Sequence, residues 1–365
     1  MSKARELAEL GAVYDSGALS NRNLIINGAM TLAQRGTSVT GITGSGYQTL
    51  DRFKTSGSAG GTWTMAQTAI TDLAQFAQSL KMDVTTAKSS PDSGSSFRIQ
   101  TLLEGQDLQR FAKGTSSAKE YSLSFYVKGT TTGTYIVEFY DADNTRHVSK
   151  AYTIDAANTW EYKTLLFPAD TTGAFDNDNA NSLIISWYLM AGSDLTSGTL
   201  QQTWGAASNT TRASGQVNLA ASTSNDWQIT GVQLEVGSEA TPFEHRSFGD
   251  ELHRCQRYFE VIVSGDSREI GGGNYYSSSS IHCPTIFETS KRTNSYSVTV
   301  TGGTNYFRVY RNGTSDDFDG FTGSTRANIN RCLLYASSGV SGTAGHGLEL
   351  LTNNASAKVV VDDEL

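Results

Sequence analysis

The residues best suited to bind a metal ion are three short runs of aspartate and asparagine, at positions 141–144, 176–179 and 316–319. Carboxylate and amide oxygens are the ligands that Ca²⁺ prefers. The same residues are also common in ordinary turns, and none of the runs has the full spacing of an EF-hand loop. Two interpretations stay open, plain turns or a structural calcium ion. The candidate calcium ligands are Asp141, Asp143, Asp176 and Asp178.

Aromatic residues near amides and hydroxyls suit sugar binding, because sugar rings stack on flat apolar faces while Asn, Asp and Gln bind hydroxyl groups. The chain has five tryptophans, Trp63, Trp160, Trp187, Trp204 and Trp227. Trp187 and Trp227 lie in strongly apolar runs, which predicts that they are core residues. Trp204 lies in the polar sequence 201–205, and it is the better candidate for an exposed sugar contact.

The sequence 271–278 is a candidate recognition surface in the last third of the chain. It reads Gly-Gly-Gly-Asn-Tyr-Tyr-Ser-Ser, and these residue types also make up the adaptable binding loops of antibodies. We expect a mobile loop that displays Asn274, Tyr275 and Tyr276 to a receptor. A contact between copies of the chain, or a plain connector, would have the same composition.

Residues for catalysis or zinc binding are present, but not in a recognised arrangement. None of the five histidines belongs to a nucleophile or zincin motif, and sequence cannot place two carboxylates at the separation that glycoside hydrolysis needs. We therefore expect no enzyme activity and assign no catalytic residue. Six zinc-type residues in the last third lack a CxxC or HxxxH spacing, and buried thiols with surface imidazoles are the simpler interpretation. They are His253, Cys255, His282, Cys283, Cys332 and His346.

Composition argues against several classes of protein. The chain has 365 residues, enough for two or three domains. Its net charge is −8 and no run of Lys or Arg occurs, which argues against a nucleic-acid partner. No segment approaches the roughly 20 apolar residues that span a bilayer, and the N-terminus lacks the apolar core of a signal peptide. We expect a protein assembled in a cytoplasm, without membrane insertion.

Alternating apolar residues predict that strands position most of these groups. Between residues 23 and 247, period-two runs such as 97–103 and 121–127 are separated by clusters of Gly, Asn and Asp. Such runs bury one face of each strand, so we expect antiparallel sheets packed as a β-sandwich or jelly roll. Near Gly231 the parity of the apolar residues changes, which predicts a β-bulge.

The rest of the chain divides into three segments. Within residues 1–22, the apolar spacing over 2–10 predicts an amphipathic helix that is too short to hold alone in water and therefore needs a surface. Residues 248–260 have apolar side chains at helical steps and predict a connecting helix. Residues 261–365 alternate again and predict a second, smaller β-sandwich. The predicted fold class is therefore all-β, with one N-terminal helix and one helix between the sandwiches.

Three blocks of sequence resemble fibre and other virion-surface proteins of tailed bacteriophages, notably those of marine and cyanobacterial phages. The first combines Ser-Lys-Ala-Arg-Glu-Leu-Ala (2–8), Asn-Leu-Ile-Ile-Asn-Gly-Ala-Met (23–30), Gln-Arg-Gly-Thr-Ser (34–38) and Asp-Arg-Phe (51–53). The second, 231–261, includes Gly-Val-Gln-Leu-Glu-Val-Gly (231–237) and Thr-Pro-Phe-Glu-His-Arg (241–246). The third is the terminus Val-Asp-Asp-Glu-Leu (361–365).

The resemblance implies a virion protein that docks on the particle, tail or capsid, through its N-terminal segment. The central domain would resemble the jelly roll of a carbohydrate-binding module, a fold that often carries a structural calcium ion, and the last domain would bind a host-surface receptor. The resemblance favours a glycan over a protein as that receptor. Fibres of this kind are usually homotrimers. For docking we expect an apolar face from Leu7, Leu10 and Tyr14, with Lys3 and Arg5 as charged contacts.

Two other functions stay open at this point. The chain could be a capsid decoration or head-fibre protein that never touches a receptor. It could also be a polysaccharide depolymerase, although the sequence offers no catalytic motif for one.

Overall fold

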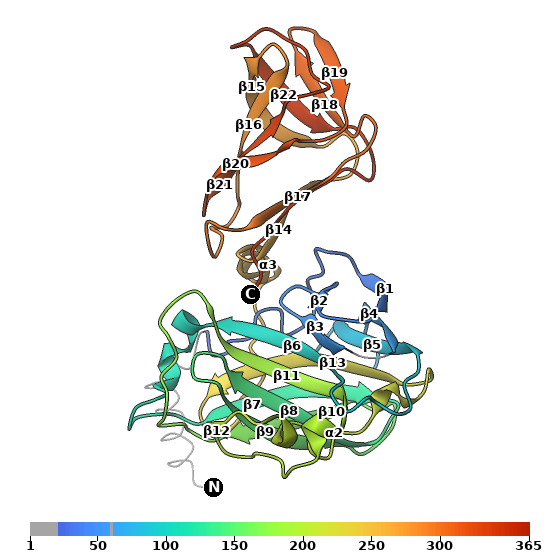
Figure 1. The fold of residues 1–365 in the computed structure, drawn as a ribbon, viewed down its shortest axis with the longest axis vertical. Coiled ribbons are helices and arrows are strands. Elements are labelled where there is room, and N and C mark those ends of the chain that lie inside the picture. Colours follow the sequence, from blue (N-terminus) through green and yellow to red (C-terminus); the bar gives the residue numbers. More distant parts are fainter. Residues whose placement is uncertain (1–20, 59–60) are drawn as a thin grey trace. The chain divides into compact units, whose positions relative to one another are not determined.

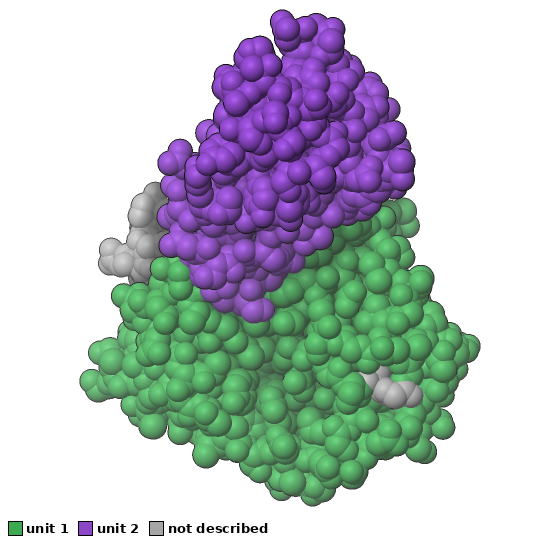
Figure 2. Space-filling model, turned by 45° about the horizontal axis from the view of Figure 1, so that its top comes forward, with its two compact units in different colours: residues 1–248 green, residues 249–365 purple. Residues whose placement is uncertain are grey.

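Antiparallel strands make up nearly all of the regular secondary structure in the described residues, which confirms the predicted all-β class. The computed structural model describes residues 21–58 and 61–365. The chain divides into two units, residues 1–248 and 249–365 (Figures 1 and 2). The predicted docking residues lie outside the described residues: Lys3, Arg5, Leu7, Leu10 and Tyr14. None of the helices in the described part is long and apolar enough to cross a membrane.

Unit 1 is a sandwich of two antiparallel sheets (Figure 1). Sheet A has the strand order β1 (Ser38–Ile42), β4 (Thr62–Ala69), β5 (Gln78–Thr86), β13 (Asp226–Val236), β7 (Tyr121–Gly129) and β10 (Glu161–Phe167). Sheet B has the order β12 (Gly205–Ala206), β9 (Arg146–Ile154), β8 (Gly133–Asp141), β11 (Asn181–Ala191), β6 (Ser96–Glu104), β3 (Lys54–Ser58) and β2 (Gly46–Tyr47). Short helical turns lie in the connections: η1 (Gly105–Phe111), α2 (Ser193–Thr196), η2 (Asn209–Thr211) and η3 (Leu219–Ala221).

The core of unit 1 is built from the alternating residues that the sequence pattern identifies. On β7, Leu123, Phe125 and Val127 are fully buried, while the residues between them face the other side of sheet A. Each such side chain contributes about 1.5–3 kcal/mol through burial of apolar surface. Three tryptophans are fully buried in the same core, which confirms the prediction for two of them: Trp63, Trp187 and Trp227.

Strand β13 contains the predicted bulge. Its pairing with β7 shifts register between Thr230 and Gln233, and Gly231 between them has a left-handed φ of +62°. The extra residue places Ile229 and Val232 on the same buried face, which restores a common apolar side to a strand whose parity changes.

The segment that follows β13 is bound to the segment that leads into unit 1. Arg246 donates hydrogen bonds to the carbonyl groups of Asn23 and Ile25, the second at 3.0 Å. The carboxylate of Glu244 accepts the backbone N–H of Asn23 at 2.8 Å, and the backbone N–H of Glu244 is bound by Gln233 at 2.7 Å. Residues from the first two sequence blocks are therefore neighbours in space, joined by hydrogen bonds among these five residues.

Unit 2 is a second, smaller antiparallel sandwich. Sheet C has the order β14 (Phe259–Ser264), β23 (Lys358–Asp362) and β17 (Ser297–Thr301). Sheet D has the order β19 (Thr314–Phe318), β18 (Phe307–Arg311), β22 (Gly347–Thr352), β15 (Glu269–Ser277), β16 (Ser280–Ile286), β21 (Arg331–Ala336) and β20 (Gly323–Asn328). Val263 and Val359 of sheet C share one core with Leu334 and Leu350 of sheet D.

The predicted helix over 248–260 is present but shorter, because α3 spans Phe248–Gln256 and Phe259 already begins β14. The chain turns between them, where Lys291 donates a hydrogen bond of 2.5 Å to the carbonyl of Gln256 and also pairs with the carboxylate of Glu260. Phe259 and Glu260, which the helical spacing had placed in the helix, instead pair with β23 as part of β14.

Candidate ligand-binding site

The sequence 271–278, expected to be a mobile loop, instead forms most of β15, an inner strand of sheet D that pairs with both β22 and β16. Its glycines allow close contact between strands: a Cβ atom at Gly273 would lie 2.3 Å from the backbone oxygen of His282. Glycine within a strand often marks such a close approach. The loop prediction was wrong because composition alone does not separate this case from a turn.

Tyr275 is fully buried in the core of unit 2, so the expectation that it is displayed to a receptor is wrong. Its hydroxyl group accepts a hydrogen bond of 2.9 Å from Nε of Arg311, which also pairs with Asp316 at 2.8 Å. Successive residues of a strand point to opposite faces, so Tyr275 and Tyr276 cannot both face outward.

Tyr276 is 65% exposed on the outer face of sheet D. Its ring stacks on His282, with centroids 4.4 Å apart and planes 16° from parallel. In the register, His282 stands between Asn274 on β15 and Tyr335 on β21, and the Tyr335 ring is edge-on to it at 6.4 Å. We call these four residues the Tyr276 cluster.

The sequence missed His282 and Tyr335 as members of this cluster. Alternation along their strands could have shown which way each side chain points. It could not show that β15, β16 and β21 are neighbours, because strand order is a property of the whole sheet.

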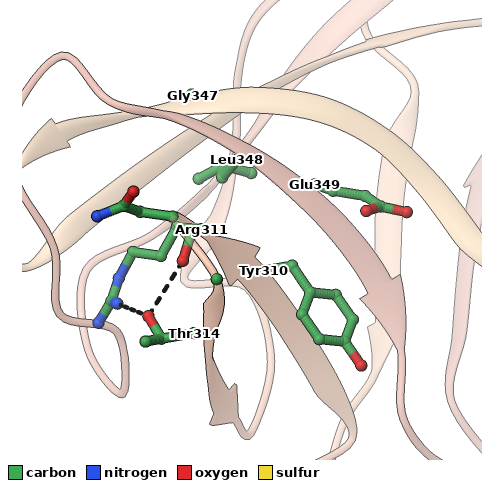
Figure 3. A pocket seen from close by; sticks show the side chains of 8 residues that line it. Tyr310, Arg311, Thr314, Gly347, Leu348 and Glu349 are labelled. Carbon is green, nitrogen blue, oxygen red and sulfur yellow. Dashed lines mark hydrogen bonds between the residues drawn. The ribbon is translucent and has the colours of Figure 1, made fainter.

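A hollow of about 270 Å³ is lined by the end of β18, the turn from β18 to β19 and the start of β22 (Figure 3). Tyr310, 43% exposed, stands opposite Glu349 in the strand register, and both side chains are drawn on one side of the hollow, away from Arg311. Glu349 in turn stands opposite Gly272, two residues before Asn274. Tyr310 and Glu349 therefore lie on the same face of sheet D as the Tyr276 cluster, separated from it by Gly272, a residue without a side chain.

This face has the groups that sugar binding requires. The stacked rings of Tyr276 and His282 offer a flat apolar surface, and the amide of Asn274 and the carboxylate of Glu349 can bind hydroxyl groups. An exposed aromatic ring with polar neighbours favours a ligand that has both an apolar face and hydroxyls.

Trp204 is half-buried against the core of unit 1, so it is more accessible than the fully buried Trp187 and Trp227, as expected, without being fully displayed. Its indole N–H donates to the carbonyl of Pro168 at 3.0 Å, and the ammonium group of Lys113 lies 5.2 Å from its ring centroid. These contacts use the ring as packing rather than as a binding platform.

The first two aspartate runs do come together, since the carboxylate of Asp143 accepts the backbone N–H of Asp176 at 3.0 Å. Asp178 accepts the N–H of Ala180 within its own loop. Among the described residues, no group of three or more His, Cys, Asp or Glu side chains is placed to hold a metal ion. Calcium binding by these loops stays a prediction.

Asp141, the fourth candidate calcium ligand, forms an ion pair with a lysine. The fully buried ammonium group of Lys113 lies 2.5 Å from a carboxylate oxygen of Asp141 and 3.2 Å from one of Asp170. It also donates to the carbonyl groups of Thr172 and Gly173, at 3.1 and 2.6 Å. Four oxygen atoms thus surround a cation that is part of the chain.

Glu138, His147 and Thr211 form an acid–imidazole–hydroxyl relay that the sequence did not indicate. Nδ1 of His147 is 3.0 Å from the Glu138 carboxylate, and its Nε2 is 3.2 Å from the Thr211 hydroxyl. Such a relay can activate a nucleophile, but here Arg212 binds both oxygens of Glu138, at 2.6 and 2.8 Å. Tyr188 donates a further hydrogen bond to Glu138. The network joins the 192–217 connection to sheet B.

The three cysteines are free thiols, all buried, as the simpler interpretation predicted: Cys255, Cys283 and Cys332. Burial raises the pKa of the Cys283 thiol to about 11, and burial likewise raises the pKa of Cys332 to about 11. Their surroundings therefore favour the protonated, unreactive form.

Comparison with known proteins finds similarity to solved structures, while no protein-family model and no curated protein matches. The enzymatically active domain of tailspike protein 4 of bacteriophage CBA120 shares 14% identity over 59% of this chain and 21% of that chain, with a TM-score of 0.31. A family 61 carbohydrate-binding module solved with β-1,4-galactotriose shares 10% sequence identity. The match covers 59% of this chain and 99% of that chain, with a TM-score of 0.30. The tandem CBM22 domain of Xyn10C from Paenibacillus barcinonensis shares 11% sequence identity. The match covers 91% of this chain and 98% of that chain, with a TM-score of 0.25.

Likeness at these TM-scores assigns no role to any residue. The described part of the chain is all-β, with two antiparallel sandwiches and exposed aromatic side chains on the second.

Proposed function

We propose that this chain is a virion-surface fibre protein of a tailed phage, and that it binds a glycan on the host cell through the outer face of sheet D. The observation that carries the proposal is the exposed Tyr276–His282 stack with Asn274 beside it. The Tyr276 ring is mostly exposed to water, so it contributes little to the core of unit 2. A sugar ring laid on it would cover this apolar surface.

The three sequence blocks support the virion part of the proposal. In this account residues 1–22 dock on the particle, on tail or capsid, and the chain works as a homotrimer. Several copies on one particle would raise the avidity of individually weak sites by large factors. Individual affinities in the millimolar to micromolar range would then suffice for attachment.

The test is glycan-array binding by the full-length chain and two variants. Tyr276→Ala removes the exposed ring, and we expect it to weaken the strongest array signal about tenfold. Ile286→Ala is the matched control, because Ile286 is 75% exposed on β16, where its spacing of four residues from His282 puts it on the same face, but it is not aromatic. The control should stay within about twofold of wild type. Equal losses in both variants, or no glycan bound by wild type, would count against the proposal.

Two further measurements separate the alternatives. Antibody labelling of intact particles shows whether tails or heads carry the chain, and exclusive head labelling without glycan binding would favour a decoration protein. Incubation with host polysaccharide separates binding from cleavage, since shortened chains would require a depolymerase.

A further inference from the structure

Exposed apolar side chains in unit 1 concentrate on one edge of sheet A. Apart from Phe248 at the unit boundary, the exposed large apolar residues in the described part of unit 1 are Tyr162 and Leu166, at 48% and 41%. Both lie on β10, the edge strand of sheet A, and both point away from the core. Scattered exposed apolar residues are ordinary, so the case for a binding surface here depends on the rings that lie beside Tyr162.

Tyr162 begins a row of rings that crosses the outer face of sheet A. It pairs with Tyr126 on β7, with ring centroids 4.9 Å apart. Phe76 follows at 5.5 Å from Tyr126, and Phe243 and the exposed His245 lie 5.0 and 5.4 Å from Phe76. With Trp160, which precedes β10, these residues form what we call the aromatic row.

Trp160 is held in a fixed orientation beside Tyr162. Its indole N–H donates to one oxygen of Asp72 at 2.9 Å, and Lys128 binds the other oxygen at 3.0 Å. The ammonium group of Lys128 also lies 4.9 Å from the Trp160 ring centroid. A ring fixed before binding loses little conformational freedom when a ligand arrives, which favours affinity.

Spacing and charge indicate what would bind. Residues two apart on a strand are separated by about 7 Å on the same face, so Trp160, Tyr162 and the exposed hydroxyl of Thr164 offer successive contacts along the edge. Lys128 is neutralised by Asp72, and Lys163 by Glu161 at 2.6 Å. From these observations we infer that the Trp160–Tyr162 end of the aromatic row is a second glycan-binding site, which takes a neutral, linear polysaccharide along β10.

A protein partner fits this edge less well. Tyr162 and Leu166 together expose on the order of 200 Å² of side-chain surface, whereas a stable protein interface buries about 800 Å² on each partner. Lys163, at the same edge, is the kind of charged residue that discourages pairing with a second strand.

The test is titration of the full-length chain with cellohexaose and xylohexaose, followed by tryptophan fluorescence, with hexagalacturonate as the acidic counterpart. We expect a neutral hexasaccharide to change the emission, and Trp160→Phe to remove most of that change. Tyr162→Ala should weaken the neutral ligand about tenfold. Thr153→Ala, the control at an exposed position on β9 of the other sheet, should stay within about twofold, and both variants should keep the wild-type melting temperature within a few degrees.

Three results would overturn the inference: no emission change with either neutral hexasaccharide, equal weakening by Tyr162→Ala and Thr153→Ala, or tighter binding of hexagalacturonate. Sedimentation is measured in parallel, and loss of self-association in Tyr162→Ala without loss of sugar binding would make the row a contact between copies. This outcome is separate from the proposed function, because Tyr276→Ala leaves the aromatic row intact and Tyr162→Ala leaves the Tyr276 cluster intact.

Discussion

Phe76 lies directly over Gly231, since a Cβ atom on residue 231 would come within 2.6 Å of the Phe76 Cζ atom and 3.1 Å of the Tyr126 ring. The bulge in β13 therefore has two consequences. It restores the buried face of the strand, and it leaves bare backbone on the outer face for a ring to rest on. Gly231 begins the second sequence block, and Phe243 from the same block packs against Phe76. Two residues of the second sequence block, Gly231 and Phe243, therefore support Phe76 in the aromatic row.

Gly231→Ala should destabilise unit 1 by about 2–4 kcal/mol, because it adds a steric clash to a left-handed backbone position. Gly41→Ala is the matched control: Gly41 has φ +73° and no atom within 4 Å of its Cβ position, so backbone strain alone should cost about 1 kcal/mol. Urea unfolding of both variants measures the difference. Equal losses would mean that Phe76 moves aside freely.

Much of the fold could be predicted from local patterns. The alternation that buries Leu123 and Phe125, and the parity change at Gly231, follow from the period of a strand. The end of α3 could not be predicted in this way. It depends on Lys291 and on the pairing of Phe259 with Asp362, more than 100 residues along the chain.

Lys113→Met should destabilise unit 1 by about 3–5 kcal/mol, because it leaves the buried carboxylates of Asp141 and Asp170 without their shared cation. Lys119→Met, at an exposed position a few residues away, should change stability by less than about 0.5 kcal/mol. Thermal unfolding of the two variants is the measurement. Similar melting temperatures would show that the buried ammonium group is dispensable.

Melting of the wild-type chain in CaCl2 and in EDTA tests the calcium prediction. If the ammonium group of Lys113 already supplies the positive charge beside Asp141 and Asp170, the melting temperatures in CaCl2 and in EDTA should agree. A bound calcium ion would instead raise the melting temperature in CaCl2, since a ligand of the folded state stabilises it by mass action. A rise that disappears in Asp143→Asn would place the ion in these loops.

Stability should fall at acid pH through Glu138. Burial by itself would raise the pKa of this carboxyl group, but the hydrogen bond with His147 and the charge of Arg212 outweigh it and lower the pKa to about 2. The resulting stabilisation is present above the unfolded value of 4.5 and is lost as pH falls through about 2; it amounts to about 3 kcal/mol at most.

Urea unfolding between pH 6 and pH 2 measures this effect. Glu138→Gln should be less stable at pH 6 and show a shallower decline, whereas Glu239→Gln, on the surface, should follow wild type. Parallel curves for Glu138→Gln and wild type would show that other carboxyl groups determine the acid sensitivity.

Cys283 and Cys332 should resist thiol reagents in the folded chain at pH 8, because both are buried and their pKa values are raised to about 11. Mass spectrometry after alkylation should find them unmodified, and fully modified in denaturant. Rapid alkylation of the native chain would show that sheet D opens locally.

The candidate sites show where sequence reasoning reaches its limit. Composition identified the neighbourhood of Asn274 and Tyr276, yet it also selected Tyr275, whose ring is buried. It selected Trp204 from its polar sequence, although packing against the core decides the exposure of that ring. Tyr162 was not selected at all, because a ring becomes part of a surface only through the strands beside it.

The most direct test of the central claim, that this chain attaches a particle to a host cell through sheet D, is an adsorption-competition assay. Host cells are first incubated with saturating purified protein, and the adsorption of particles that carry this chain is then measured. The account predicts that wild type and Ile286→Ala block adsorption, while Tyr276→Ala blocks it much less. Adsorption that is unchanged by saturating wild-type protein would contradict the account.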